Sequence, residues 1–585
     1  TVVPVTNGVA INVTDTLESG GSTNSSNGRT DTAEWQDSLT MTQKKHTIKV
    51  GFQVEDEFYY NMTRTNFNGT YTFSTLDQYV SALAGLAPAT QYTVNTGDPK
   101  LRYSQYEASW YVNDDIRMKQ SLTISLGLRH EFQQHLQDKL NLAPRFSIAW
   151  MPFKSRKSVI RAGGGVFFSR LTAGSYANTL RYNNDTQQTY TIPDPMFQPV
   201  PLPLDQLTLA QRRNTTIQQL DPNLKAPYNI SNMLSFEQQL PKALVATVSY
   251  NINRGLHLFE TRNINAPLPG TGQRPDPTRG NIYNLESDGK SIRNEISFGL
   301  SRRFSTRFLF FTTYRLAWAK DDVAFPADSY NLMAEWARSS GDRRHQFNTF
   351  FIINLPWGIR LSPQMNINSG TPFNITTGLD DNHDTQFTDR PAGIGRNADL
   401  PASLYPLIPM PDRVVLLANG SSMSLINYLN TFFPNGLKAE SPGSFNANFG
   451  ISKTFSFGTR SNQLARNRQD SGDLGIPGAD GGGIGQGGGG RGGQGGGGRG
   501  GFGGGGGGRG GFGGGGGGGR GGFGGRRGGG DENALYTLRF GANFTNIFNH
   551  VNYGPFSGTL GSPYLGFPSY ASSPRQLNFN LAVTF

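Results

Sequence analysis

The chain of 585 residues contains no cysteine. A disulfide framework, a zinc ribbon and a thiol nucleophile are therefore excluded together. Long hydrophobic runs are missing as well, because no stretch approaches the roughly 18 to 20 apolar residues that a membrane-spanning helix requires. Charged residues make up only 16%, too few for a chain disordered throughout, and hydrophobic residues only 36%, too few for a soluble core of this size.

Hydrophobic side chains instead recur at every second position in many short segments. Leu122, Ile124, Leu126 and Leu128 share one face of such a segment, and the residues between them are polar or glycine. Residues 576–585 repeat the same alternation at the end of the chain. Each segment is about ten residues long, the length of a β-strand that crosses a bilayer at a tilt. The pattern therefore predicts membrane-spanning strands with one face toward lipid and the other toward a lumen.

The connections between these segments alternate between short and long. Short connections such as QKK, MKQ and PKA join neighbouring segments in pairs. Long polar segments separate the pairs, at 61–101, 170–228, 255–290, 321–342, 372–442 and 549–574. This rhythm is typical of an up-and-down antiparallel transmembrane β-barrel with tight periplasmic turns and long extracellular loops. We expect an all-β fold with about 15 or 16 strands in this chain.

One connection that should be a tight turn is replaced by a low-complexity tract. Residues 459–533 separate barrel strands and loops in 1–458 from the last two strands in 534–585, and 481–530 contain only Gly, Arg, Phe, Gln and one Ile. A glycine-rich chain has few side chains to bury, so we expect a disordered periplasmic insertion. The Arg and Phe residues also resemble an RGG box that binds RNA. The position between two barrel strands favours a solvated tether, or contact with an anionic surface, over nucleic acid binding.

Candidate sites for chemistry are sparse. No set of nucleophile, base and orienting residue is recognisable, and the sequence predicts no enzyme and no cofactor. Asp380, Asn382 and Asp384 alternate in the loop 380–389 and offer hard oxygen atoms that Ca²⁺ accepts. Thr385 stands where an EF-hand loop requires glycine, and the alternative interpretation is a solvated acidic loop.

Several motifs resemble a known family. The segment YVNDDIRMKQSLTISLGLRHE at 111–131 is similar to a strand-turn-strand of TonB-dependent receptors. SGDRRHQF at 340–347, SGTPFNIT at 369–376, FTDRP at 387–391 and FTNIFNHVNYG at 544–554 resemble the Oar-like subgroup of these receptors. The ending QLNFNLAVTF is similar to the signal by which the outer-membrane assembly machinery recognises barrels, and Phe585 is its last residue.

The resemblance implies a barrel of about 22 strands in the full family member, in the outer membrane of a Gram-negative bacterium. It further implies an N-terminal plug and import of a scarce ligand with energy from the TonB-ExbB-ExbD complex. No TonB box and no plug are recognisable in this sequence, so we expect the C-terminal part of such a receptor. The alternatives are a passive porin-like channel, and a surface or RNA-binding protein that acts through the RGG-like tract.

Under the transport hypothesis, polar side chains that point into the lumen line the path of the ligand. The candidates are Arg129, Glu131, Arg293, Glu295, Gln364, Asn366 and Arg539. The alternative for each is an inward polar position of the kind that any barrel contains.

Overall fold

The computed structural model describes residues 8–14, 16–21, 26–202, 215–302, 307–409, 411–417, 420–459, 534–568 and 570–584. The RGG-like tract and Phe585 lie outside these residues.

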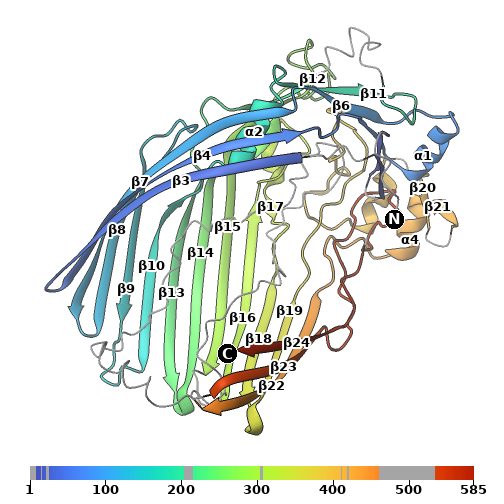
Figure 1. Cartoon of the computed structure of the whole chain (residues 1–585). Helices are drawn as coiled ribbons and strands as arrows, with labels where there is room; N and C mark the ends of the chain where they lie inside the picture. Colours follow the sequence, from blue (N-terminus) through green and yellow to red (C-terminus); the bar gives the residue numbers. More distant parts are fainter. Residues whose placement is uncertain are drawn as a thin grey trace.

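A curved antiparallel wall dominates the structure (Figure 1). It is an up-and-down meander of 15 strands, in which each strand pairs with the next strand of the wall. The wall strands are β3 Ser26–Gln43, β4 His46–Thr63, β7 Lys100–Lys119, β8 Leu122–Gln133, β9 Asn141–Trp150, β10 Ser158–Phe168, β13 Tyr228–Leu240, β14 Leu244–Asn263, β15 Ile282–Arg302, β16 Phe308–Asp321, β18 His345–Asn354, β19 Ile359–Asn368, β22 Ser444–Thr459, β23 Ala534–Thr545 and β24 Gln576–Thr584. The expected fold class and the expected strand number are confirmed.

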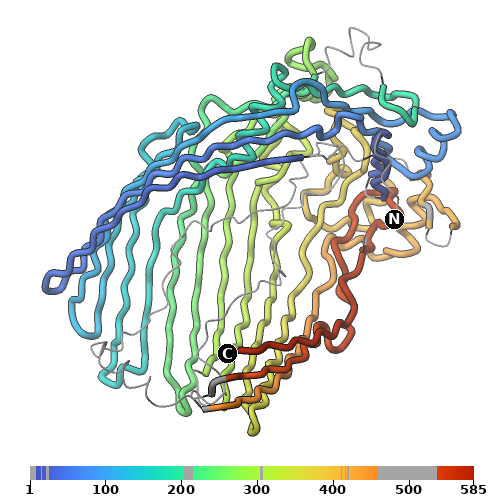
Figure 2. Tube along the Cα trace, in the orientation of Figure 1, coloured from blue at the N-terminus to red at the C-terminus, as the bar shows by residue number. Residues whose placement is uncertain are grey.

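Short turns and long excursions lie at opposite ends of the wall (Figure 2). Two of the turns are single 3-10 turns, η2 Pro241–Ala243 and η4 Pro356–Gly358. The expectation of a long polar loop over 255–290 is wrong in part, because β14 continues to Asn263 and β15 already begins at Ile282. These two strands pair beyond the usual length of a membrane strand, with irregular register around Leu258.

The long loops contain secondary structure of their own. The loop strands are β1 Ala10–Val13, β2 Leu17–Gly20, β5 Thr70–Phe73, β6 Gln91–Gly97, β11 Gln187–Pro193, β12 Thr215–Leu220, β17 Ala337–Arg338, β20 Val414–Leu416 and β21 Ser422–Ser424. The loop helices are α1 Leu76–Leu83, α2 Ala173–Arg181, η3 Leu332–Glu335, η5 Ala402–Leu407 and α4 Leu425–Phe432. Within the described residues, every helix is too short or too polar to cross a membrane.

The strand register sorts side chains into an apolar face and a polar face. One cross-strand row on the apolar face consists of Trp150, Ile160, Phe236, Val248, Phe298, Tyr314, Phe347, Ile367 and Phe445. The row one residue away consists of Arg161, Ser235, Ser249, Ser297, Arg315, Gln346, Asn368 and Ser444. Large apolar side chains on the first face are strongly exposed, such as Phe298 at 48% and Leu126 at 52%. An exposed apolar face on one side and a polar face on the other is the pattern of a barrel wall in lipid.

Besides a small cluster of Leu136, Leu171, Leu224 and Ala226, two larger hydrophobic cores lie in the loops. The first is built around Tyr71, Phe73 and Tyr92, which pack with β1, β6 and β11. The second is built around Tyr405, Tyr428 and Leu429 from the segment 372–442, with Leu560 and Leu565 from the last long loop. The loops therefore form a folded cap, which we define as residues 64–97, 182–202, 372–442 and 550–568. Figure 1 shows α1, α4, β20 and β21 gathered at the loop end of the wall.

Candidate functional site

The register places all seven residues proposed to border the lumen on the polar face. Arg293 and Glu295 alternate with the apolar row on β15, and Gln364 and Asn366 do so on β19. Arg539 on β23 donates a hydrogen bond to Ser452 on the neighbouring strand over 3.3 Å. That this face borders a transport path stays a prediction.

Two of the seven residues contact each other beside a cavity. The Arg129 Nε and Glu131 Oε1 atoms are 2.8 Å apart, and a guanidinium nitrogen of Arg129 also donates to Ser109 over 2.8 Å. Arg293 forms a similar pair with Glu295 on β15, also at 2.8 Å. The cavity next to Arg129 has a volume of about 40 Å³ and opens between β4, β7, β8 and the loop that follows β10.

Carboxylates crowd this part of the polar face. Glu34, Glu55 and Glu107 stand directly opposite one another on β3, β4 and β7, and Gln133 on β8 completes the row. Glu55, Glu107 and Gln133 line the cavity together with Glu131. Sequence reasoning missed Glu55 and Glu107, because their alignment depends on a strand register that the alternation of residues does not fix.

A loop segment packs against the same face. Arg170, which follows β10, places its Nε 2.7 Å from Glu107 and its Nη1 3.1 Å from Glu55. The backbone of Leu171 accepts hydrogen bonds from Gln105 and Gln133, and its N–H donates to Gln133 over 2.8 Å. Helix α2 follows directly, capped by Thr172, whose hydroxyl accepts the N–H of Ser175. The sequence predicted only a long polar loop here.

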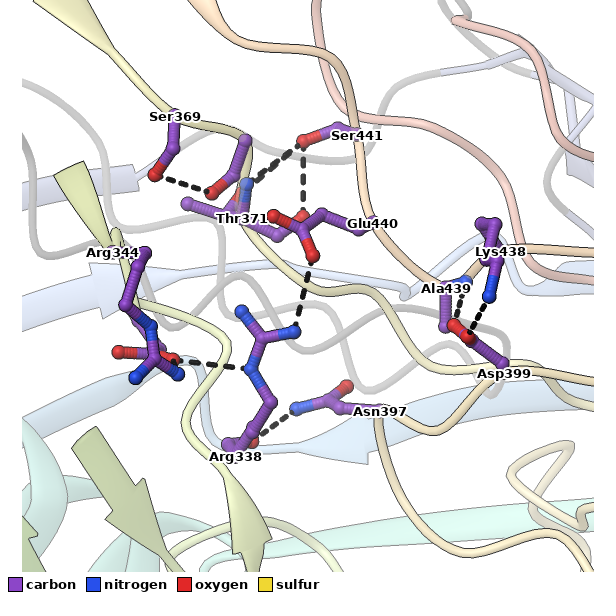
Figure 3. A network of polar contacts seen from close by, with 12 residues as sticks. Arg338, Arg344, Ser369, Thr371, Asn397, Asp399, Lys438, Ala439, Glu440 and Ser441 are labelled. Atoms are coloured by element: carbon purple, nitrogen blue, oxygen red, sulfur yellow. Dashed lines mark hydrogen bonds and ion pairs between the residues drawn. The ribbon is translucent and has the colours of Figure 1, made fainter. Parts of the chain in front are cut away.

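Polar contacts hold the segment 372–442 to the rim of the wall (Figure 3). Arg338 donates to Asp342 over 3.1 Å and to Glu440 over 3.2 Å, and Arg344 donates to the same Asp342 carboxylate over 3.3 Å. Within the segment itself, Asp399 accepts from Lys438 at 2.8 Å and from the backbone of residue 439 at 2.9 Å. Asp342 of the SGDRRHQF motif thus accepts from Arg338, which in turn contacts Glu440 of the segment 372–442.

A buried ion pair reinforces this attachment. Arg390 of the FTDRP motif donates to Glu335 with both terminal nitrogens, and the two side chains are only 9% and 2% exposed. Arg396 pairs with Asp321 at the end of β16. These two pairs join the segment 372–442 to η3 and to the end of β16.

The candidate calcium ligands lie in a tightly wound loop. The Asp380 carboxylate accepts the backbone N–H of Thr385. The Asn382 side chain accepts the N–H of Asp384, and the Asp384 carboxylate accepts the N–H of Gln386. Asp384 is fully buried, and burial raises the pKa of its carboxyl to about 7. A calcium ion at this loop stays a prediction.

A different acidic group lies on the outer part of the wall. Among the described residues, the carboxylates of Glu260, Glu286 and Asp288 are those close enough to share a metal ion. Arg262 donates to both oxygens of Glu286, at 2.7 and 2.9 Å, and already neutralises part of this group.

One protein family matches most of the chain. The family model of the outer membrane beta barrel domain matches residues 3–141 and 136–466. No curated protein matches the chain.

Solved structures with a similar fold share little sequence with the chain. The outer membrane transporter YddB from Escherichia coli has a TM-score of 0.51 at 10% identity, over 99% of this chain and 57% of its own length. A mutant of the ferric enterobactin receptor PfeA from Pseudomonas aeruginosa, in complex with enterobactin, has a TM-score of 0.46 at 10% identity. The match covers 95% of this chain and 54% of the receptor. The siderophore receptor PirA from Acinetobacter baumannii has a TM-score of 0.45 at 10% identity, and the match covers 95% of this chain and 55% of PirA. The chain therefore spans little more than half the length of these proteins, and the likeness to the first one concerns the fold.

Proposed function

The chain belongs to the outer membrane beta barrel domain family and lies in the outer membrane, and from this premise we propose that it forms part of a TonB-dependent transporter for ligand uptake. The proposed role is transport and not catalysis. The observation that carries the proposal is the folded cap at the loop end of the wall, together with Arg170 and Leu171, which bond to Glu107 and Gln133 on the polar face. A passive channel needs an open mouth, whereas a receptor needs a structured surface that captures a ligand.

The edges of the wall also favour a transporter over a porin. Among the described residues, β3 pairs with β4 alone and β24 pairs with β23 alone. Unpaired strand edges are costly inside a bilayer, so both edges need partners in the membrane. Closing an odd meander of 15 strands on itself would place β3 parallel to β24, and bacterial barrels have an even number of antiparallel strands. Further strands between the two edges, as in a larger transporter barrel, remove this conflict.

The proposed transport function implies specific partners. Outer-membrane lipid would contact the apolar face, and the assembly machinery would recognise the end of the chain at Phe585. Energy would reach the barrel from TonB-ExbB-ExbD through a plug that is not recognisable in this chain. The likeness in fold to the Escherichia coli transporter supports this class of function.

Two measurements on the full-length protein test the proposal without knowledge of the ligand. The purified protein is titrated with the isolated periplasmic domain of TonB, and its conductance is recorded in planar bilayers. We expect saturable binding of TonB and no steady open current. A large steady current without TonB binding would contradict the proposal and establish the porin-like alternative.

Deletion of the RGG-like tract distinguishes the transporter from the second alternative, a surface or RNA-binding protein. Deletion of residues 461–530 is expected to leave TonB binding and barrel assembly unchanged, because the flanking strands β22 and β23 pair directly with each other. A surface or RNA-binding protein would instead lose its binding of single-stranded RNA on this deletion, and that loss would favour the second alternative.

A further inference from the structure

The row of carboxylates on β3, β4 and β7 is unfavourable for the wall alone. Glu34, Glu55 and Glu107 lie directly opposite one another, and like charges in this position weaken the pairing of strands. Glu57 lies two residues from Glu55 on the same face, and Glu131 is on β8 beside the cavity. Such a row calls for a positive group in the space in front of it.

Arg170 shows which kind of group the row accepts. Its guanidinium bridges Glu55 and Glu107 at 3.1 and 2.7 Å, although it comes from a loop and its side chain remains 45% exposed. The other Glu107 oxygen accepts a hydrogen bond from Gln133 over 2.9 Å. The planar donor group of an arginine therefore already occupies part of the site.

Positive charge remains in deficit around the cavity. Three carboxylates, those of Glu55, Glu107 and Glu131, line the cavity, against two guanidinium groups, those of Arg129 and Arg170. Arg129 is already engaged by Glu131. Glu55 and Glu107 share the single guanidinium of Arg170, so the cavity keeps an uncompensated negative charge that favours a cationic N–H donor.

We propose that this cavity binds an ammonium or guanidinium group of the transported ligand, between Glu55, Glu107 and Glu131. The proposal rests on the proposed transport function and specifies the chemical class of the ligand. A volume of about 40 Å³ accommodates a cationic head group and leaves the rest of the ligand in the lumen. A metal ion fits less well, because among the described residues the only three carboxylates close enough to share one are Glu260, Glu286 and Asp288.

Binding of agmatine, which carries a guanidinium and an ammonium group, tests the proposal on the purified full-length protein in detergent. Isothermal titration calorimetry is run on the wild type, on Glu107→Gln and on Glu237→Gln. The Glu237 carboxylate pairs with Arg161 at 3.1 Å on the same face and does not line the cavity, so it is the matched control. The heat-induced shift on gels confirms that each variant is a folded barrel.

We expect the wild type and Glu237→Gln to bind agmatine equally, with an affinity that falls as salt is added. Glu107→Gln should bind about tenfold more weakly, because a charged hydrogen-bond acceptor is lost. Arg170→Gln should bind more tightly, because the internal guanidinium no longer competes. Absence of binding, equal binding by Glu107→Gln, weaker binding by Arg170→Gln, or binding of Ca²⁺ without agmatine would each overturn the proposal. TonB binding is measured on the same preparations, so that failure of this inference is distinguished from failure of the transport function.

Discussion

Arg413 donates a hydrogen bond from Nη2 to the backbone carbonyl of Ser74 over 2.7 Å, across 339 positions of the sequence. Its Nη1 donates to the carbonyl of Thr377 over 3.0 Å, and the side chain is 8% exposed. Burial lowers the pKa of the guanidinium to about 10, so it stays charged at neutral pH. One arginine thereby joins the two hydrophobic cores of the cap.

Replacing this arginine should loosen the cap. In Arg413→Met the carbonyls of Ser74 and Thr377 lose a charged donor, and we expect the cap to lose about 2–4 kcal/mol of local stability. Hydrogen exchange of the amides in α1 and α4 measures the effect. Arg279→Met, which removes an exposed pair with Asp276, should leave exchange unchanged. Equal exchange in the wild type and Arg413→Met would show that the two cores do not depend on this link.

The pair of Glu335 on η3 and Arg390 should hold the segment 372–442 to the loop that follows β16. In Arg390→Ala a carboxylate that is only 2% exposed remains without its partner, which costs about 3–5 kcal/mol. Limited proteolysis should then cleave this segment faster while the wall stays intact. Lys438→Ala removes an exposed ion pair and serves as the control, since its cleavage rate should match the wild type. Unchanged cleavage of Arg390→Ala would contradict an attachment role.

The stability of the cap should fall as pH rises from about 4 to 7. Burial raises the pKa of Asp389 from 3.8 to about 7, so the folded cap holds a proton that the unfolded chain releases. The stabilising contribution is therefore complete below the unfolded pKa and is lost as pH rises through 7, with a slope of up to about 1.4 kcal/mol per pH unit. Rates of cap proteolysis with an acid-tolerant protease measure this trend.

Asp389→Asn carries an amide that does not ionise, and should show a flatter pH profile than the wild type. A residual slope is expected from Asp384, whose pKa burial also raises to about 7. A cap that becomes more stable between pH 4 and 7 would refute the sign of this prediction.

Charge on the apolar face should be tolerated far less than charge on the polar face. Phe298 lies in the apolar row of β15, and its neighbour Ser297 lies in the polar row and bonds to Ser249 over 2.6 Å. Phe298→Arg should cost about 2–4 kcal/mol, and Ser297→Arg much less. The folded fraction of each variant in lipid vesicles, read from its heat-induced shift on gels, gives the comparison. Equal loss in both variants would speak against a lipid-facing row.

The wall could be predicted from the sequence because its signal is local. Alternation around Leu126 and the short connection at 241–243 depend on neighbouring residues alone, and β8 and η2 lie where these patterns indicate. The cap could not be predicted in this way, because its cores join Tyr428 to Leu565 and Tyr71 to Tyr92 through contacts between distant segments. The row of Glu55 and Glu107 could not be predicted for the same reason, because the two residues become neighbours only through the register of β4 and β7.

The absence of cysteine permits a direct test of which residues face lipid. Single cysteines are placed at each position from Leu122 to Leu128 of the protein in lipid vesicles, and each is labelled with a fluorophore that brominated lipid quenches. The account predicts strong quenching at Leu122, Ile124, Leu126 and Leu128 and weak quenching at the three positions between them. Quenching that is uniform along β8, or that repeats with the period of a helix, would contradict the barrel wall on which the proposed transport depends.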